Sequence, residues 1–185
     1  MDWSPDGRFI LYRNLDPKSN YDLRAVAVES DRKPFPVVQT PFDERDGQFS
    51  PDGKWIAYQS NETGHYEIYV QPFPGPGGGK WQITNDGGVE VRWRHDGREI
   101  FYIALDGRLM AMPIRMDSSA PSVEPGTPVP LFRPRIASGA TLQGYKQQYV
   151  VASDGQRFLI NSLIEEATTS PITLILNWKP SSSEK

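Results

Sequence analysis

The chain has 185 residues, a net charge of −3 and no cysteine. This length is sufficient for one sizeable core, and the lack of cysteine excludes disulfides, cysteine metal ligands and cysteine nucleophiles. The acidic balance argues against the clustered basic face of a nucleic-acid binder, and no apolar run approaches the ~18 residues of a membrane span. We therefore expect no nucleic-acid partner and no membrane insertion.

One turn motif recurs four times along the chain. It reads WSPDG at residues 3–7, FSPDG at 49–53, WRHDG at 93–97 and VASDG at 151–155, and its glycines are 46, 44 and 58 residues apart. Proline presets the backbone of such a turn, and glycine takes the left-handed conformation that closes a tight hairpin. A repeat of roughly 40–50 residues is typical of β-propeller blades.

Each turn is followed by a short segment that is apolar on both faces, at residues 10–12, 56–58, 100–102 and 158–160. Such a strand is expected between two packed layers. Third strands are predicted at 23–28, 67–71, 108–114 and 172–178, and short fourth strands at 37–40, 81–84 and 129–132. Residues 89–93 alternate cleanly and are predicted to form the first strand of a unit.

These elements predict an all-β fold, a β-propeller of about four four-stranded antiparallel blades. The blades are placed at about residues 2–40, 44–84, 88–132 and 146–178, and the polar tail 179–185 is expected to be disordered. Both ends fall inside blades, which favours an arc of a larger propeller, or a ring that a partner completes, over a four-bladed ring that closes imperfectly. An arc exposes apolar blade faces, so a homodimer of two arcs is the specific form expected.

Segment 115–145 departs from the repeat and contains five prolines. We interpret it as a mobile connector with one short edge strand around 129–132, rather than as a functional loop.

The pattern of the second unit, FSPDGKWIAYQSNETGHYEIYVQPFPGPGGGKWQIT, resembles the blade signature of TolB-type, WD-repeat-like bacterial β-propellers. More narrowly, residues 69–84, 93–102 and 172–178 are similar to the C-terminal propeller of bacterial proteins in which a serine/threonine kinase or signalling domain comes first. The resemblance covers about residues 2–178. It implies a protein-interaction or sensory module, periplasmic or otherwise extracytoplasmic, without catalysis of its own and without a cofactor. The third and fourth turns depart from the signature, with Arg94-His95 and Ala152-Ser153 in place of Ser-Pro.

Candidate site residues come from the innermost strands, which line the central channel of a propeller. Alignment of the turns places Asp46 with Glu90, and Gln48 with Arg92. We predict that Asp46, Glu90 and Arg92 form a polar channel rim that binds a peptide or small ligand, and the alternative is a hydrated channel whose charges pair with one another. Two residues that precede this strand are candidates for a contact at the channel mouth, Glu44 and Arg45.

The chemistry of catalysis has little support in the sequence. His65 and His95 lie in predicted loops, and the chain has no nucleophile elbow and no histidine pair at metal-ligand spacing. We therefore predict a non-catalytic module of a bacterial signalling or envelope protein, with a protein or peptide partner. Two alternatives stay open: an enzyme, hydrolase or lyase, that uses channel carboxylates and His95, and a structural fragment that assembles with further copies of itself to close a ring.

Overall fold

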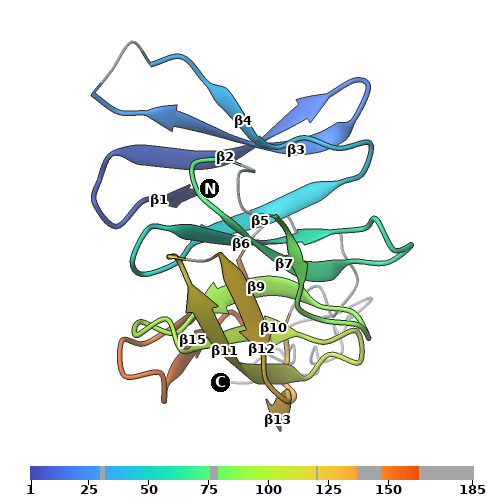
Figure 1. The fold of residues 1–185 in the computed structure, drawn as a ribbon. Coiled ribbons are helices and arrows are strands. Elements are labelled where there is room, and N and C mark those ends of the chain that lie inside the picture. Colours follow the sequence, from blue (N-terminus) through green and yellow to red (C-terminus); the bar gives the residue numbers. More distant parts are fainter. Residues whose placement is uncertain (30–31, 76–78, 120, 137–146, 163–185) are drawn as a thin grey trace, which may run out of the picture.

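The computed structural model describes residues 1–29, 32–75, 79–119, 121–136 and 147–162, and these residues form four antiparallel sheets (Figure 1). The first sheet has the order β1 (Asp2–Trp3), β2 (Phe9–Asp16), β3 (Asn20–Ala27), β4 (Phe35–Val38). The second has the order β5 (Glu44–Phe49), β6 (Trp55–Ser60), β7 (Glu67–Pro72), β8 (Trp81–Gln82). The described residues contain no helix that is long and apolar enough to span a membrane.

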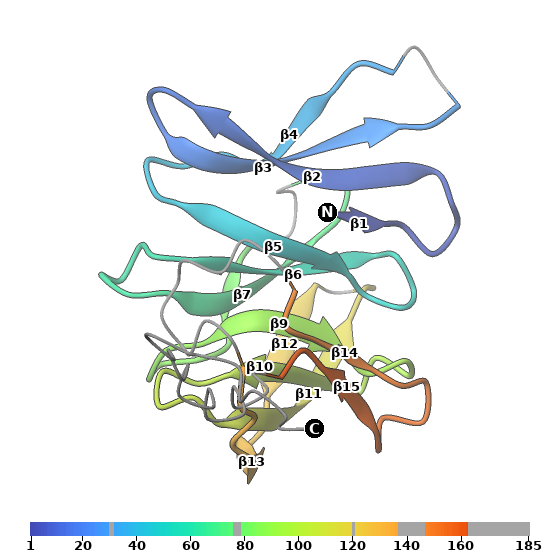
Figure 2. The same ribbon diagram turned by 180° about the vertical axis from the view of Figure 1, so that it is seen from behind.

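The third sheet contains β9 (Val89–Trp93), β10 (Glu99–Ile103), β11 (Leu109–Asp117) and β12 (Ser122–Pro125), and β13 (Val129–Phe132) pairs with β11 as well. The last sheet in the described part is the hairpin of β14 (Tyr149–Val151) and β15 (Phe158–Ile160). The sheets follow one another as blades of an open propeller arc (Figures 1 and 2). The innermost strands β1, β5, β9 and β14 lie next to one another in that order.

The repeated turn uses the same hydrogen bonds in the first two blades. Ser4 Oγ donates to Asp6 Oδ1 (2.6 Å) and accepts from the N–H of Phe9 (2.8 Å), while Gly7 N donates to Ser4 O (2.8 Å). The turn at 49–53 repeats each of these bonds. Left-handed φ angles of +72°, +69°, +71° and +68° occur at the four motif glycines, Gly7, Gly53, Gly97 and Gly155. An unpredicted fifth copy with Gly107 joins β10 to β11.

Adjacent turns also contact each other. A Cβ at Gly53 would lie 3.6 Å from Cδ of Pro5, and a Cβ at Gly97 would lie 3.8 Å from Cδ of Pro51. The turns of the first three blades therefore stack in a row along one side of the arc.

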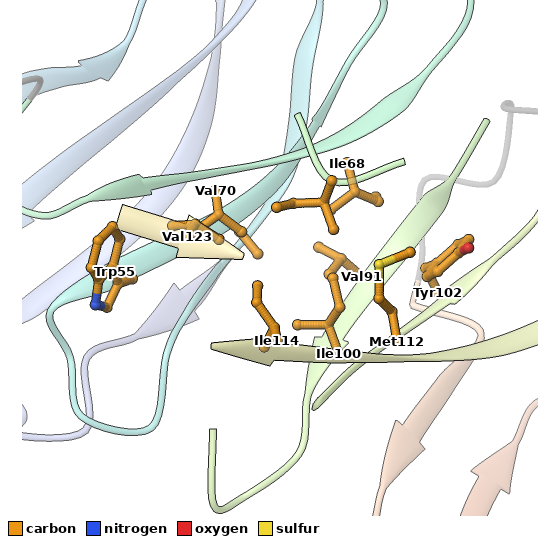
Figure 3. Close-up of a cluster of buried hydrophobic side chains, with 11 residues drawn as sticks. Trp55, Ile68, Val70, Val91, Ile100, Tyr102, Met112, Ile114 and Val123 are labelled. Atoms are coloured by element: carbon orange, nitrogen blue, oxygen red, sulfur yellow. The ribbon is translucent and has the colours of Figure 1, made fainter. Parts of the chain in front are cut away.

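The core consists of the layers between neighbouring blades. One layer joins the first two blades and contains Leu11, Leu23, Ala25, Val37, Val38, Phe49, Ile56, Tyr58 and Tyr69. The next layer joins the second and third blades around Trp55, Ile68, Ile100 and Tyr102 (Figure 3). A third layer joins the third blade to β14 and β15. Full burial stabilises each large apolar side chain by about 1.5–3 kcal/mol, so the blades are held together mainly by these layers.

Several strand predictions differ from the structure in extent. Strands β4 and β8 end before Gln39, Thr40 and Thr84, because these side chains bond buried carboxylates rather than continue the strand. Segment 115–145 is more regular than expected in its described part, since β11 continues to Asp117 and pairs there with the unpredicted β12. The predicted strand at 129–132 is present as β13. The predicted strand at 172–178 and the tail 179–185 lie outside the described residues.

Candidate functional site

Asp46 and Glu90 occupy equivalent bulges in the innermost strands of the second and third blades. The pairing of β5 with β6 shifts between Arg45 and Gln48, and the pairing of β10 with β9 shifts at the corresponding place. At these bulges Asp46 has φ +51° and Glu90 has φ +56°. Such left-handed backbone costs a non-glycine residue about 1–3 kcal/mol, and the bulge redirects its side chain.

Glu90 connects three sheets. Its carboxylate accepts the N–H of Gln148 (3.0 Å), its own N–H donates to Gln59 Oε1 (3.0 Å), and its carbonyl accepts the Tyr149 hydroxyl (2.8 Å). Burial raises the pKa of Glu90 to about 7, the nearby charge of Asp46 adds to the rise, and Arg92 opposes it. Through these bonds Glu90 holds the inner strand β9 to the blades on either side of it, which is a structural role for a residue of the predicted channel rim.

Arg92 is 6% exposed and lies two residues after Glu90 in the same inner strand, β9. Its guanidinium lies 5.5 Å from the ring centroid of Tyr149, and Nη1 donates to the carbonyl of Val91 (2.5 Å). The buried Nε has no hydrogen-bond partner among the described residues. A buried donor without a partner costs about 1–3 kcal/mol, so Arg92 retains unused hydrogen-bonding capacity.

Two adjoining cavities run along the inner strands, and we call them together the inner groove. Asp46 and Gly47 line the first, which has a volume of about 310 Å³. Arg92 lines the second, of about 550 Å³, with Asp2 and His95 at its wall. Both cavities are lined by Met1, Gln48 and Gln147, which places them side by side. The structure therefore brings Asp46 and Arg92 to one continuous groove.

Asp2 lines the second cavity of the inner groove. Its carboxylate accepts the N–H of Phe49 (2.7 Å), a bond that ties β1 to β5. Burial raises the pKa of Asp2, whereas this backbone bond and the charge of Arg92 lower it. Asp2 was not among the predicted site residues, since a strand of two residues, β1, gives no local signal of such a contact.

Glu44 differs from its predicted place at the channel mouth, because it is fully buried. One carboxylate oxygen accepts the Thr40 hydroxyl, and the other has no partner among the described residues. Burial raises the pKa of Glu44 to about 7, and the charge of Asp22 adds to the rise. Glu44 therefore lies out of reach of a ligand in this conformation.

Arg45 makes one ion pair and two cation–π contacts beside the bulge at Asp46. Its guanidinium bonds both oxygens of Asp43, at 2.7 and 2.5 Å, and lies 4.7 Å from the Tyr21 ring and 5.7 Å from the Tyr66 ring. The Tyr66 hydroxyl donates to Asp43 Oδ2 (2.7 Å). Because Asp43 already accepts two hydrogen bonds from the Arg45 guanidinium, this charge is not available to a ligand. Arg45 instead holds β5 in position.

Asp22 and Glu67 form a pair of equivalent buried carboxylates that were not predicted as site residues. Glu67, at the start of β7, accepts His65 Nε2 (2.7 Å), the Thr84 hydroxyl and the N–H of Gly87 (3.0 Å). Asp22 holds the equivalent place in β3 and accepts from Ser19 and Gln39. The signal in the sequence is an acidic residue directly before the apolar third strand in the first two blades. These bonds attach the loop after the fourth strand to the blade, and they explain His65 as a structural partner of Glu67.

The chemistry that the inner groove offers a ligand comes from the side chains that line it. Among the described residues, no group of three or more His, Asp or Glu side chains is arranged to hold a metal ion. His95 is exposed and shares a cavity wall with Asp2 and Arg92. The inner groove is thus a surface of mixed charge, with the two arginines Arg13 and Arg92 and the two carboxylates of Asp2 and Asp46.

Comparisons with known proteins support the fold. The chain matches the structure of a putative TolB from Agrobacterium tumefaciens with a TM-score of 0.52 and 22% identity, over 71% of this chain and 48% of that one. It also matches a putative 6-phosphogluconolactonase from Bacteroides uniformis with a TM-score of 0.53 and 13% identity, over 86% of this chain and 46% of that one. No protein-family model and no curated protein matches the sequence.

These similarities define the class of fold, a TolB-like β-propeller, as the blade signature predicted. The chain spans about half the length of either matched protein, which agrees with an open arc of blades. At these identities the likeness shows the fold and leaves the activity open, since one of the two matched proteins is described as an enzyme.

Proposed function

We propose that this chain is a non-catalytic interaction module that binds an extended peptide of a protein partner in the inner groove. The observation that carries the proposal is the bulge at Asp46, which holds a non-glycine residue at φ +51° on the wall of the groove. Strained backbone of this kind persists where the surrounding structure over-determines it, and it is concentrated at binding sites.

The charges in the inner groove indicate the chemistry of the ligand. Asp46 lies in one cavity and Arg92 in the adjoining one, and both are close enough to influence the pKa of Glu90. A peptide with a basic side chain next to an acidic one complements this pair. The indole rings of Trp3 and Trp93 line the same groove and offer apolar contact area.

Panning of a phage-displayed library of random twelve-residue peptides against the purified chain tests the proposal. Selected peptides are titrated by tryptophan fluorescence, because Trp93 lines the groove. We expect Asp46→Asn and Arg92→Gln each to weaken binding by about tenfold or more, as loss of one partner of a desolvated charge pair does. The matched controls are Glu29→Gln and Lys18→Gln, at exposed positions, and they are expected to leave affinity unchanged. Failure to select any peptide, or equal affinity in all four variants, overturns the proposal.

One observation favours an enzyme as the second candidate. His95 lines the same cavity as Asp2 and Arg92, so a potential base, a carboxylate and a cation face one space. Hydrolysis of 6-phosphogluconolactone by the purified chain is the direct assay, because one matched structure is described as a putative 6-phosphogluconolactonase. Turnover that His95→Gln abolishes would replace the interaction module by an enzyme, and the expected result is no turnover above the spontaneous rate.

The bacterial signalling context and the extracytoplasmic location remain predictions that rest on the TolB resemblance. Fractionation of cells that express the natural protein, with detection by an antibody against this chain, checks the location. Recovery in the cytoplasmic fraction would contradict it.

A further inference from the structure

The far end of β11 and the edge strand β12 form a hairpin that packs against the second blade. Val123 of β12 lies in the same core layer as Val70 of β7 (Figure 3), and Lys54 Nζ donates to Ser118 Oγ (3.3 Å) across the boundary between the two blades. Since β12 is the strand farthest from the innermost strand β9 in its sheet, this hairpin lies on the outer rim of the arc.

Two adjoining cavities follow this hairpin, and we call them together the rim groove. The first has a volume of about 530 Å³ and is lined by Pro113 and Glu124. The second, of about 520 Å³, lies between the hairpin and the turn of the second blade, at Asp52. Arg98 and Arg115 line both cavities. The walls belong to the second and third blades, each of which has a described neighbour on either side, so the ends of the described arc do not create this groove.

Arg98 is free because another arginine takes its usual partner. In the first turn, the arginine after the glycine, Arg8, pairs with the turn aspartate Asp6, with 3.8 Å between Nη1 and Oδ2. In the third turn the equivalent aspartate, Asp96, is engaged by Arg94, whose Nε lies 3.5 Å from Asp96 Oδ2. Arg98, the repeat equivalent of Arg8, is exposed, and its guanidinium makes no hydrogen bond or ion pair with any described residue.

Arg115 is the second free guanidinium of the rim groove. It lies directly across the β11–β12 ladder from Glu124, where opposite charges commonly pair. No hydrogen bond or ion pair joins these two side chains, and Arg115 has no other partner in the described part of the chain. The N–H of Ile114 donates to the carbonyl of Arg98 (2.9 Å), so the two arginines stand on neighbouring segments.

The carboxylates of the rim groove do not neutralise both arginines. Asp96 is held by Arg94. Asp52 Oδ1 accepts the Ser50 hydroxyl (2.6 Å) and the N–H of Lys54 (3.1 Å) within its own turn. Glu124 is the one carboxylate of the groove without a bond to a described residue. The first cavity therefore has two free guanidinium groups against one free carboxylate.

We propose that the rim groove binds an extended acidic segment of a partner protein, with one carboxylate on Arg98 and a second on Arg115. Guanidinium groups bind carboxylates through two parallel hydrogen bonds, and clusters of arginine recognise acidic segments. In an extended chain, side chains two residues apart lie on the same side, about 7 Å from each other, so alternate acidic residues suit two arginines on neighbouring segments. Pro113 and Met116 provide apolar walls for the residues between them. This site is separate from the inner groove and does not rest on the proposed function.

The probe for this site is a fluorescein-labelled peptide in which the sequence Pro-Glu-Leu-Glu is repeated three times, titrated with the purified full chain by fluorescence anisotropy. We expect saturable binding, and none for the same peptide with Gln in place of Glu. Arg98→Gln and Arg115→Gln are each expected to weaken binding by about fivefold, the size of an exposed ion pair. Arg8→Gln is the matched control, because it removes the same charge at the equivalent turn position of the first blade, and it is expected to leave affinity unchanged.

Glu124→Gln gives a test in the opposite direction. Removal of the free carboxylate ends its repulsion of the peptide, so affinity is expected to rise by about threefold. Circular dichroism checks that all variants are folded, which is expected since the four positions are exposed. Absence of saturable binding, an affinity that the two groove arginine variants leave unchanged, an equal loss in Arg8→Gln, or weaker binding by Glu124→Gln would each overturn the proposal. Binding of only a phosphoserine form of the peptide would also overturn it, because the groove would then recognise phosphate.

Discussion

Gly47 in β5 leaves the space that Leu11 of β2 fills. A Cβ at Gly47 would lie 2.7 Å from Cδ2 of Leu11 and 3.0 Å from Cδ1 of Leu23. Both leucines are at most 1% exposed, so a side chain at Gly47 requires them to shift within a packed layer. The innermost strand of the second blade thus approaches the first blade most closely at a residue without a side chain.

Gly47→Ala is therefore expected to destabilise the chain by about 1–3 kcal/mol, as overpacking of a well-packed core does. Urea denaturation followed by tryptophan fluorescence measures the change. Gly75→Ala is the control, because a Cβ at Gly75 meets nothing within 4 Å. Equal midpoints for Gly47→Ala and the wild type would show that the layer between the blades yields more easily than its burial indicates.

Replacement of Asp46 separates backbone strain from binding. Asp46→Gly is expected to raise the unfolding free energy by about 1 kcal/mol, because glycine adopts φ +51° without strain. Asp46→Ala is expected to lower it, since alanine tolerates left-handed backbone less well than aspartate does. Thermal melts of the two variants check both signs. A lower melting temperature for Asp46→Gly would contradict the assignment of strain to this bulge.

Glu44 and Glu90 make stability depend on pH. Each has a folded-state pKa of about 7 against an ordinary value of 4.5, so between these values the folded chain holds protons that the unfolded chain has released. The contribution of these two groups to the unfolding free energy is then greatest below pH 4.5 and falls as the pH rises through about 7, by roughly 1–3 kcal/mol for each group. Urea titrations at several pH values measure the slope.

Glu44→Gln assigns part of that slope to one group. Its amide stays neutral, so the variant is expected to be more stable than the wild type at pH 8 and to show a shallower fall between pH 4.5 and 7. Glu29→Gln, at an exposed position, serves as the control and is expected to keep the full slope. A slope unchanged by Glu44→Gln would refute the buried protonated state of this carboxyl.

Thr84 links the end of the second blade to a buried carboxylate. Its hydroxyl accepts the N–H of Ile68 (2.9 Å) and donates to Glu67. Thr84→Val leaves both groups without that partner, and a loss of about 1–3 kcal/mol is expected. Faster amide hydrogen exchange at Ile68 identifies the cause. Thr63→Val, in an exposed turn, is the control and is expected to change neither quantity.

The repeat can be predicted from the sequence because each blade contains a similar turn followed by a similar apolar strand. Residues 89–93 and 129–132 are strands with the predicted bounds, since alternation and flanking turns are local signals. Strand β12 lies in a proline-rich stretch and was missed, because its pairing with the far end of β11 is a tertiary contact. Pro113 and Pro125 themselves lie within strands of this region.

The site was harder to predict for a related reason. Alignment of the turns places Asp46 and Glu90 at equivalent positions, but the bulges depend on how β5 and β9 pair with their neighbours. Burial of Glu44 depends on the first blade, which covers it from across the layer through Asp22 and Thr40. The sequence shows which strand residues are charged, whereas the burial of each one depends on segments that are distant in the sequence.

The contact between neighbouring turns has a consequence for how such arcs change in length. Pro5 meets Gly53 and Pro51 meets Gly97, so the second blade carries both sides of this contact, Gly53 toward the first blade and Pro51 toward the third. A tandem copy of the second blade would bring the same glycine and proline to the new boundary, so the same contact would form again. In this part of the arc the turns therefore allow a blade to be added without a new kind of contact between turns.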